Sequence, residues 1–180
     1  ILKMSREMCV KTQSKYFDLS RISTHRPGSS EEEREQQDTE NTLIYRYATY
    51  CMKRGRAATS DFEELRLVGL GMRAEDICAQ ILKAIKLMDV ILSCKPRPGE
   101  EGEASMCCLE MLAIDLRELF QLFSEKLRWL LQENQESGGA VFEGWSDDEV
   151  STVISRFKSF HNTRYEDVQS FIADVGAALE

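Results

Sequence analysis

The sequence predicts an all-α protein, a multi-helix bundle around one long central helix at residues 105–135. In this stretch large apolar residues recur every three or four positions, the period of one helix face. Further stretches of the same period flank it, and none alternates apolar and polar residues as a half-buried strand would. Glycine and proline, which are common in loop-rich folds, are scarce: the chain has 10 Gly and 3 Pro among 180 residues.

The predicted central helix carries a broad apolar stripe that other helices must cover. Each large side chain buried there contributes roughly 1.5–3 kcal/mol to stability. Lys126 interrupts the stripe, which argues against a long coiled coil with a second copy. The stripe consists of Leu109, Leu112, Leu116, Leu119, Phe123 and Leu130.

Two segments precede the predicted bundle. Residues 1–26 mix apolar and basic side chains, so we expect a basic amphipathic segment that packs on the body. Residues 27–40 are acidic and lack large apolar side chains, which predicts a flexible linker. In that linker Ser29 and Ser30 each have a Glu three residues on and are candidate phosphorylation sites. The chain begins with Ile, so we expect a piece of a longer protein.

Residues 41–180 read as the bundle. A helix from about residue 42 to 54 should stop at Gly55, because glycine favours the position just after a helix. Ser60 and Glu63 have the spacing of a capping box that starts the next helix. Gly69 and Gly71 predict a kink or a short break before a strong helix over 74–93, and an exposed loop is expected at 94–104.

Two short capped helices are expected to close the chain. Ser146 and Glu149 form one capping box, with Trp145 placed to pack on the first helical turn. Thr163 with Glu166 forms a second box, which predicts a new helix start there.

Charge and cysteine content limit the environment and partners. The net charge of −8 argues against direct nucleic-acid binding by the whole surface. No apolar run is long enough to cross a bilayer, and no secretory signal is visible, so no membrane association is expected. The 6 cysteines lack the paired spacing of a zinc site. We expect free thiols in a reducing compartment, the cytosol or the nucleus.

No catalytic, cofactor-binding or metal-binding constellation is present in the sequence. His25 and His161 stand alone, and His161 is expected to lie at a helix C-terminus, where its charge is favourable. There is no phosphate-binding loop, nucleophile elbow or zinc-binding helix motif. We therefore predict a non-enzymatic protein without cofactors.

The predicted function is protein–protein interaction. A helix or short motif of a partner protein would lie in a groove beside the central helix, and Phe142, Trp145, Tyr45 and Tyr50 are the candidate contact residues, since aromatic side chains often anchor interfaces. We expect a scaffold module of a larger intracellular, nuclear or chromatin-associated regulator. Homo-oligomerisation is one alternative.

Two family resemblances accompany this prediction. Val150-Ser151-Thr152-Val153, with the apolar residues that follow up to Val175, resembles a helix pair of bromodomains over residues 150–175. The asparagine that anchors acetyl-lysine in that family is absent, so the resemblance implies no acetyl-lysine site.

The second resemblance covers residues 43–72. Leu65-Arg66-Leu67-Val68-Gly69 is similar to the BH3 segment of Bcl-2-type proteins. It implies a helix-in-groove regulator as a further alternative. That alternative predicts that Leu65→Glu abolishes binding to Bcl-2 relatives without unfolding the domain.

Overall fold

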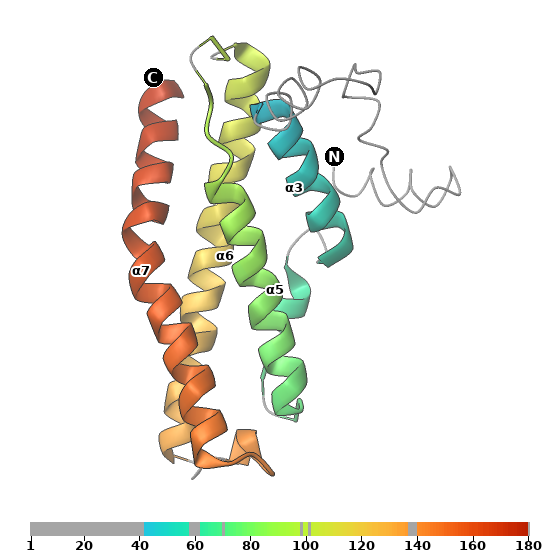
Figure 1. The fold of residues 1–180 in the computed structure, drawn as a ribbon, viewed down its shortest axis with the longest axis vertical. Helices are drawn as coiled ribbons and strands as arrows, with labels where there is room; N and C mark the ends of the chain where they lie inside the picture. Colours follow the sequence, from blue (N-terminus) through green and yellow to red (C-terminus); the bar gives the residue numbers. More distant parts are fainter. Residues whose placement is uncertain are drawn as a thin grey trace, which may run out of the picture.

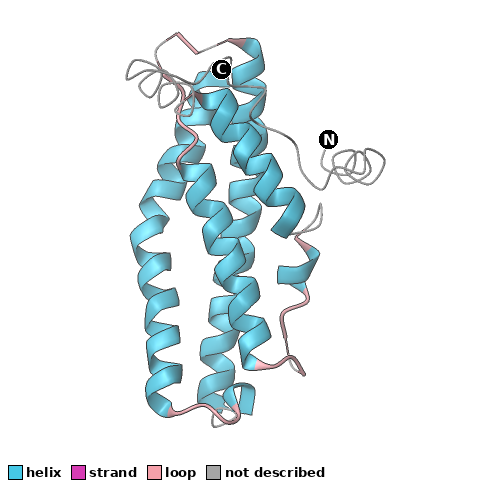
Figure 2. Ribbon diagram, turned by 45° about the vertical axis from the view of Figure 1, so that its right-hand side comes forward, coloured by secondary structure: helices cyan, strands magenta, loops and turns pink. Residues whose placement is uncertain are grey.

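The computed structural model describes residues 42–57, 62–69, 71–97, 99–100, 102–136 and 140–179. In these ranges every regular element is a helix and none is a strand, which confirms the predicted all-α fold (Figure 2). The predicted basic segment and acidic linker, with Ser29, Ser30 and His25, lie outside the described residues.

The main helices run alternately down and up the long axis of the molecule (Figure 1). They are α3 (Leu43–Ala57), α5 (Ala74–Leu92), α6 (Glu103–Glu136) and α7 (Asp147–Leu179), with the short α4 (Glu63–Arg66) before α5 and a 3-10 turn, η2 (Ala140–Phe142), before α7. Every other element contacts α6. This confirms the predicted bundle around one long helix.

The apolar stripe of α6 forms the centre of the core. Leu112, Leu116, Phe123 and Leu130 are fully buried, at 0% exposure. They pack with the buried faces of α5 and α7 in one continuous apolar cluster. Burial of this stripe is the main term that holds the bundle together.

Helix α3 does not stop at Gly55, as the sequence predicted, but continues to Ala57. Its last turn carries Arg54, which is completely buried. The Arg54 guanidinium lies 3.4 Å from the centre of the Phe62 ring, and its Nε is 3.6 Å from Asp115 of α6. This tertiary anchor extends the helix past a glycine that costs only about 1 kcal/mol.

The N-cap residue of α4, just before its first helical residue Glu63, is Phe62 and not Ser60. The predicted capping box therefore does not start this helix. Phe62 has a left-handed backbone, with φ of 51°, and makes no side-chain cap. The conformation places its ring in the core at 1% exposure, beneath Arg54. Burial of a phenylalanine outweighs the roughly 1–2 kcal/mol of backbone strain.

Lys126, the interruption in the apolar stripe of α6, holds the end of α4. Its Nζ donates to the backbone oxygens of Arg66 and Val68, at 2.7 and 2.8 Å. These carbonyls lie at and just after the end of α4, where backbone oxygens lack intrahelical donors. The predicted break at Gly69 is confirmed, since α5 begins only at Ala74.

The α5–α6 connection is tied to the start of α3. The Glu100 carboxylate accepts hydrogen bonds from the backbone N–H of Leu43, at 3.3 Å, and of Arg97, at 2.9 Å. Cys94 is fully buried, while Lys95 and Gly99 are exposed. The segment predicted as an exposed loop over 94–104 therefore packs in part on the bundle, and α6 begins within it, at Glu103.

The two short helices predicted at the C-terminus are one continuous helix, α7, so Thr163 is not a helix start. Thr163 is exposed in mid-helix, and His161 is not at a helix end. The helix continues because its buried face does: Phe157, Val168 and Phe171 all pack into the core. Between them His161 stacks on Phe120 of α6, with ring centres 5.2 Å apart.

Replacing Thr163 tests the continuity of α7. A helix-starting Thr replaced by Ala costs roughly 0.5–2 kcal/mol. An exposed mid-helix Thr replaced by Ala should instead leave the free energy of unfolding unchanged or raise it by up to about 0.7 kcal/mol. Urea denaturation followed by circular dichroism measures the difference. Ser146→Ala is the matched control and should lose about 1 kcal/mol; equal losses for both variants would contradict a continuous α7.

A buried polar cluster joins α3 to α6. The Tyr50 hydroxyl donates to the Asp115 carboxylate, which also faces Arg54. Burial, followed by the negative charge of Asp115, raises the pKa of Tyr50 above its usual range. Tyr50 therefore remains a neutral donor across the physiological range of pH.

Removing the carboxylate of this cluster should destabilise the protein strongly. Asp115→Ala removes the acceptor of the buried Tyr50 hydroxyl and a negative charge beside Arg54, and we expect a loss of about 1.5–3 kcal/mol in the free energy of unfolding. Glu110→Ala, at an exposed carboxylate of the same helix, is the matched control and should change it by less than about 0.5 kcal/mol. Equal effects of the two variants would show that the cluster adds nothing to stability.

Candidate partner-binding groove

A groove of about 1040 Å³ lies between the C-terminal end of α6, the turn that carries η2, and the first turns of α7. This is the lower end of the molecule in Figure 1, beside the central helix. Along α7 the lining extends from Asp147 to Lys158. At 1.5 Å per helical residue this is about 16 Å, or three turns.

The floor of the groove is apolar. Phe142 and Ile154 are buried, at 3% and 8% exposure, while Leu131, Trp145 and Val150 are partly exposed. Exposed Ser151 and Ser155 follow the edge of α7. Polar side chains make up much of the remaining lining, including Asn134 and Gln135 of α6. An apolar side chain that displaces water from the apolar part of the groove gains free energy.

The capping box predicted at the start of α7 fixes one edge of the groove. The Glu149 carboxylate accepts from the backbone N–H of Ser146, at 2.9 Å, and the Ser146 hydroxyl oxygen accepts from the Glu149 N–H, at 3.3 Å. These hydrogen bonds lower the pKa of Glu149, so it stays ionised. The turn before α7 therefore has a defined conformation.

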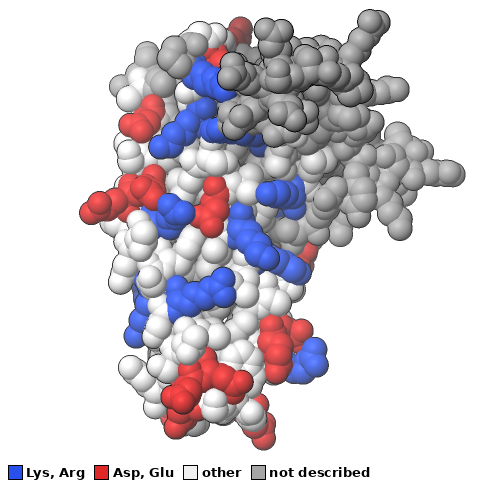
Figure 3. All heavy atoms as spheres, viewed as in Figure 1, with Lys and Arg blue, Asp and Glu red and all other residues white. Residues whose placement is uncertain are grey.

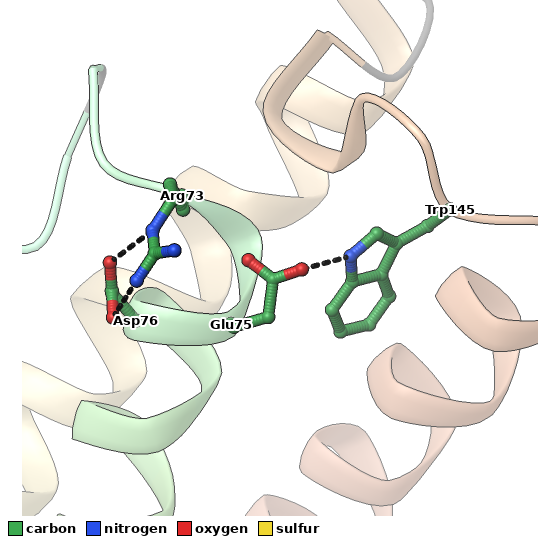
Figure 4. A network of polar contacts seen from close by, with 4 residues as sticks. All are labelled: Arg73, Glu75, Asp76 and Trp145. Atoms are coloured by element: carbon green, nitrogen blue, oxygen red, sulfur yellow. Dashed lines mark hydrogen bonds and ion pairs between the residues drawn. The ribbon is translucent and has the colours of Figure 1, made fainter.

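Trp145 fixes the same turn to α5. Its indole N–H donates to Glu75 at 3.1 Å (Figure 4). Its ring lies 5.5 Å from that of Phe142. Beside it, Arg73 pairs with Asp76 at 2.9 Å. The neighbouring carboxylates of Glu75 and Asp76 therefore have different partners. The indole thus joins three elements at the edge of the groove.

Acidic side chains gather at this end of the molecule (Figure 3). Glu143 and Asp147 line the groove and are exposed, and Asp148 is exposed next to them. Lys158 is the charged residue at the other end of the lining. In the described part of the chain, Glu143, Asp147 and Asp148 form no ion pair with a cation.

The structure brings two of the four candidate contact residues together. Phe142 and Trp145 both line the groove, Phe142 mainly as part of the core. Tyr50 is buried at 3% exposure in the Asp115 cluster and so is not available to a partner. Tyr45 is partly exposed on α3 and is not part of the groove lining.

Sequence reasoning missed the remaining lining. In the sequence Val150 and Ile154 show only the apolar period of a helix face, and no motif includes Glu143. Only the position of α7 against the end of α6 brings these residues to one surface. The signal that pointed here was the pair of aromatic residues between two predicted helices.

A second groove, of about 600 Å³, lies between the α5–α6 connection and the later turns of α7. Its floor includes Leu109 and Phe171. The carboxylates at its rim are engaged within the protein, since Asp167 pairs with Arg164 at 2.9 Å and Asp174 accepts from Ser170 at 3.3 Å, and Lys95 adds an exposed positive charge. It therefore offers less for a cationic partner to recognise.

Ser124 and His161 resemble a nucleophile–base pair but are arranged otherwise. His161 Nε2 is 3.1 Å from the Ser124 oxygen, while the Ser124 hydroxyl donates to the backbone oxygen of Phe120 at 2.7 Å. When the Ser124 hydroxyl donates to this carbonyl, its oxygen accepts from the Nε2–H tautomer of His161. A general base needs the opposite arrangement.

The described cysteines are free and mostly protected. Burial raises the pKa of the Cys94 thiol to about 12 and also raises those of Cys51 and Cys108. Only the thiolate is a good nucleophile, so a raised pKa suppresses reactivity. Cys107 is exposed on α6.

Alkylation with iodoacetamide at pH 8 checks this assignment. We expect Cys107 to react first and Cys94 to react at least about a thousand-fold more slowly in the native protein, because its thiolate fraction is small. Peptide mapping by mass spectrometry measures both, with the urea-unfolded protein as the control in which the rates converge. Equal native rates would contradict the burial of Cys94.

No helix among the described residues is long and apolar enough to span a membrane. The same residues contain no group of three or more His, Cys, Asp or Glu side chains placed to hold a metal ion. Comparisons with protein-family models, curated proteins and solved structures found no match to the chain. The bromodomain-like and Bcl-2-like resemblances therefore stay untested.

Proposed function

We propose that this protein is a non-enzymatic protein–protein interaction module, and that it binds a helix or short motif of a partner protein in the groove at the α6–α7 turn. The observation that carries the proposal is the apolar floor of that groove. Buried Phe142 and Ile154 line it together with partly exposed Leu131, Trp145 and Val150, and the turn before α7 is fixed by a capping box and by the Trp145–Glu75 hydrogen bond.

The shape of the groove favours a peptide segment. It follows about three turns of α7, which is longer than the roughly two turns over which a partner helix presents anchors at positions i, i+3, i+4 and i+7. Binding beside a turn that is already fixed costs little reorganisation of that turn. A scaffold role in a nuclear or chromatin-associated regulator remains a prediction from the sequence.

The Bcl-2-like alternative needs a different test from the one predicted. Leu65 and Val68 are buried, at 4% and 3% exposure, so their segment is part of the core. Leu65→Glu would place a charge in that core and unfold the protein. It would therefore not separate loss of binding from loss of folding.

Homo-oligomerisation is the second candidate function, and one observation favours it. Met111 and Ile114 on α6 are exposed at 39% and 56%, and Ile44 on α3 is exposed at 59%. Self-association through these residues predicts a sedimentation coefficient that rises with protein concentration. Ile114→Lys should abolish that rise without affecting the groove.

A peptide selection tests the proposed function. Random peptides of about 14 residues, roughly four helical turns, are displayed on phage and selected against the immobilised protein. We expect enriched peptides whose binding is lost with Ser155→Tyr, which fills the groove from an exposed position. Thr152→Tyr is the matched control, because Thr152 is exposed on α7 outside the lining, and it should leave binding unchanged.

Two outcomes would contradict the proposed function. In one, no peptide is enriched over a selection without protein. In the other, the enriched peptides bind both tyrosine variants as well as they bind the wild type, so that their site lies elsewhere. Circular dichroism verifies that both variants fold.

A further inference from the structure

We infer that the partner segment of this groove is a cationic amphipathic peptide: an apolar side chain enters between α6 and α7 while Lys or Arg of the same segment pairs with Glu143 and Asp147. This rests on the proposed function and adds the chemistry of the partner. The two carboxylates lie beside the apolar floor, so one segment can reach both.

The acidic residues at this end divide into those the fold uses and those it leaves free for a partner. Glu149 closes the capping box, Glu75 holds the Trp145 indole, and Asp76 pairs with Arg73. Glu143 and Asp147 are the carboxylates of the groove lining. Neither forms an ion pair with a cation in the described part of the chain.

The helix dipole explains only part of this charge. Asp147 and Asp148 lie in the first turn of α7, where carboxylates are stabilised by the positive helix end. Glu143 lies before the helix, after η2, and the dipole does not account for it. Its exposed carboxylate at the edge of an apolar groove is complementary to a cation on a bound segment.

Lys158 gives the groove a direction. It lines the end opposite Glu143, about 16 Å along α7 from Asp147 by the helical rise. A basic side chain over Lys158 would be repelled, whereas one over the α6–α7 turn is attracted. The cationic end of the segment therefore lies over the turn.

The second groove supplies a contrast within the same molecule. Asp174 at its rim accepts from Ser170 at 3.3 Å, and Arg164 neutralises Asp167 at 2.9 Å. Cationic segments should therefore prefer the groove at the α6–α7 turn. Asp174→Asn consequently serves as the matched control for charge removal.

The groove-dependent peptides from the selection provide the probe. We expect them to be enriched in Lys and Arg over the unselected library. The most enriched one is synthesised with a fluorescent label, together with a copy in which Gln replaces each Lys and Arg. Fluorescence anisotropy at about 50 mM salt, where screening is weak, measures the affinity of both.

Removing the two carboxylates should weaken only the cationic peptide. Each exposed charge pair contributes roughly two- to five-fold in affinity, so Glu143→Gln/Asp147→Asn should reduce affinity about ten-fold and leave the Gln copy unaffected. Lys158→Gln should tighten binding of the cationic peptide about two-fold. Asp174→Asn should change nothing, and the affinity of the cationic peptide should fall as salt is raised to about 300 mM.

The outcomes separate this inference from the proposed function. Groove-dependent peptides that are neutral or acidic, or a cationic peptide that binds the double variant as tightly as the wild type, would overturn the inference and leave the proposed function standing. A selection that yields no groove-dependent peptide would overturn both.

Discussion

Burial of the α6 stripe is the constraint on which the rest of the molecule depends. Leu112, Leu116, Phe123 and Leu130 have no exposure, and α6 contacts every other element. No other helix in the described part of the chain contacts every other element to this extent. The positions of α3, α5 and α7 therefore follow from packing on α6, where each covers one face. Apolar burial is non-directional, however, and does not by itself fix how far each helix slides along α6.

Polar side chains on α6 provide that registration. Asp115 holds α3 through Tyr50, Lys126 holds the end of α4, and Ser124 meets His161 of α7. Each of these polar residues accepts or donates at one definite position of a neighbouring helix. A buried polar contact adds little net stability but penalises a displaced arrangement in which its partners are lost.

The groove follows from this arrangement and from the capping box that starts α7. Phe142 and Trp145 could be predicted as candidates because aromatic residues between two helices are unusual enough to notice. Glu143 and Ile154 could not, since their shared surface exists only where α7 lies against the end of α6. Tyr50 is a candidate contact residue that the structure buries. A tyrosine side chain can serve in an interface or in a buried hydrogen bond, and the sequence does not distinguish the two.

The sequence by itself determined the fold class, the central helix and the start of α7 at Ser146, because apolar periodicity and capping are local properties of the chain. Only the tertiary structure decided that α3 passes Gly55, that Phe62 begins α4 and that α7 continues through Thr163. A glycine within a helix, or the loss of an N-cap residue, changes helix stability by only about 1 kcal/mol. Burial of Arg54 on Phe62, and of the two halves of the α7 face on α6, outweighs them because each large side chain removed from water contributes more.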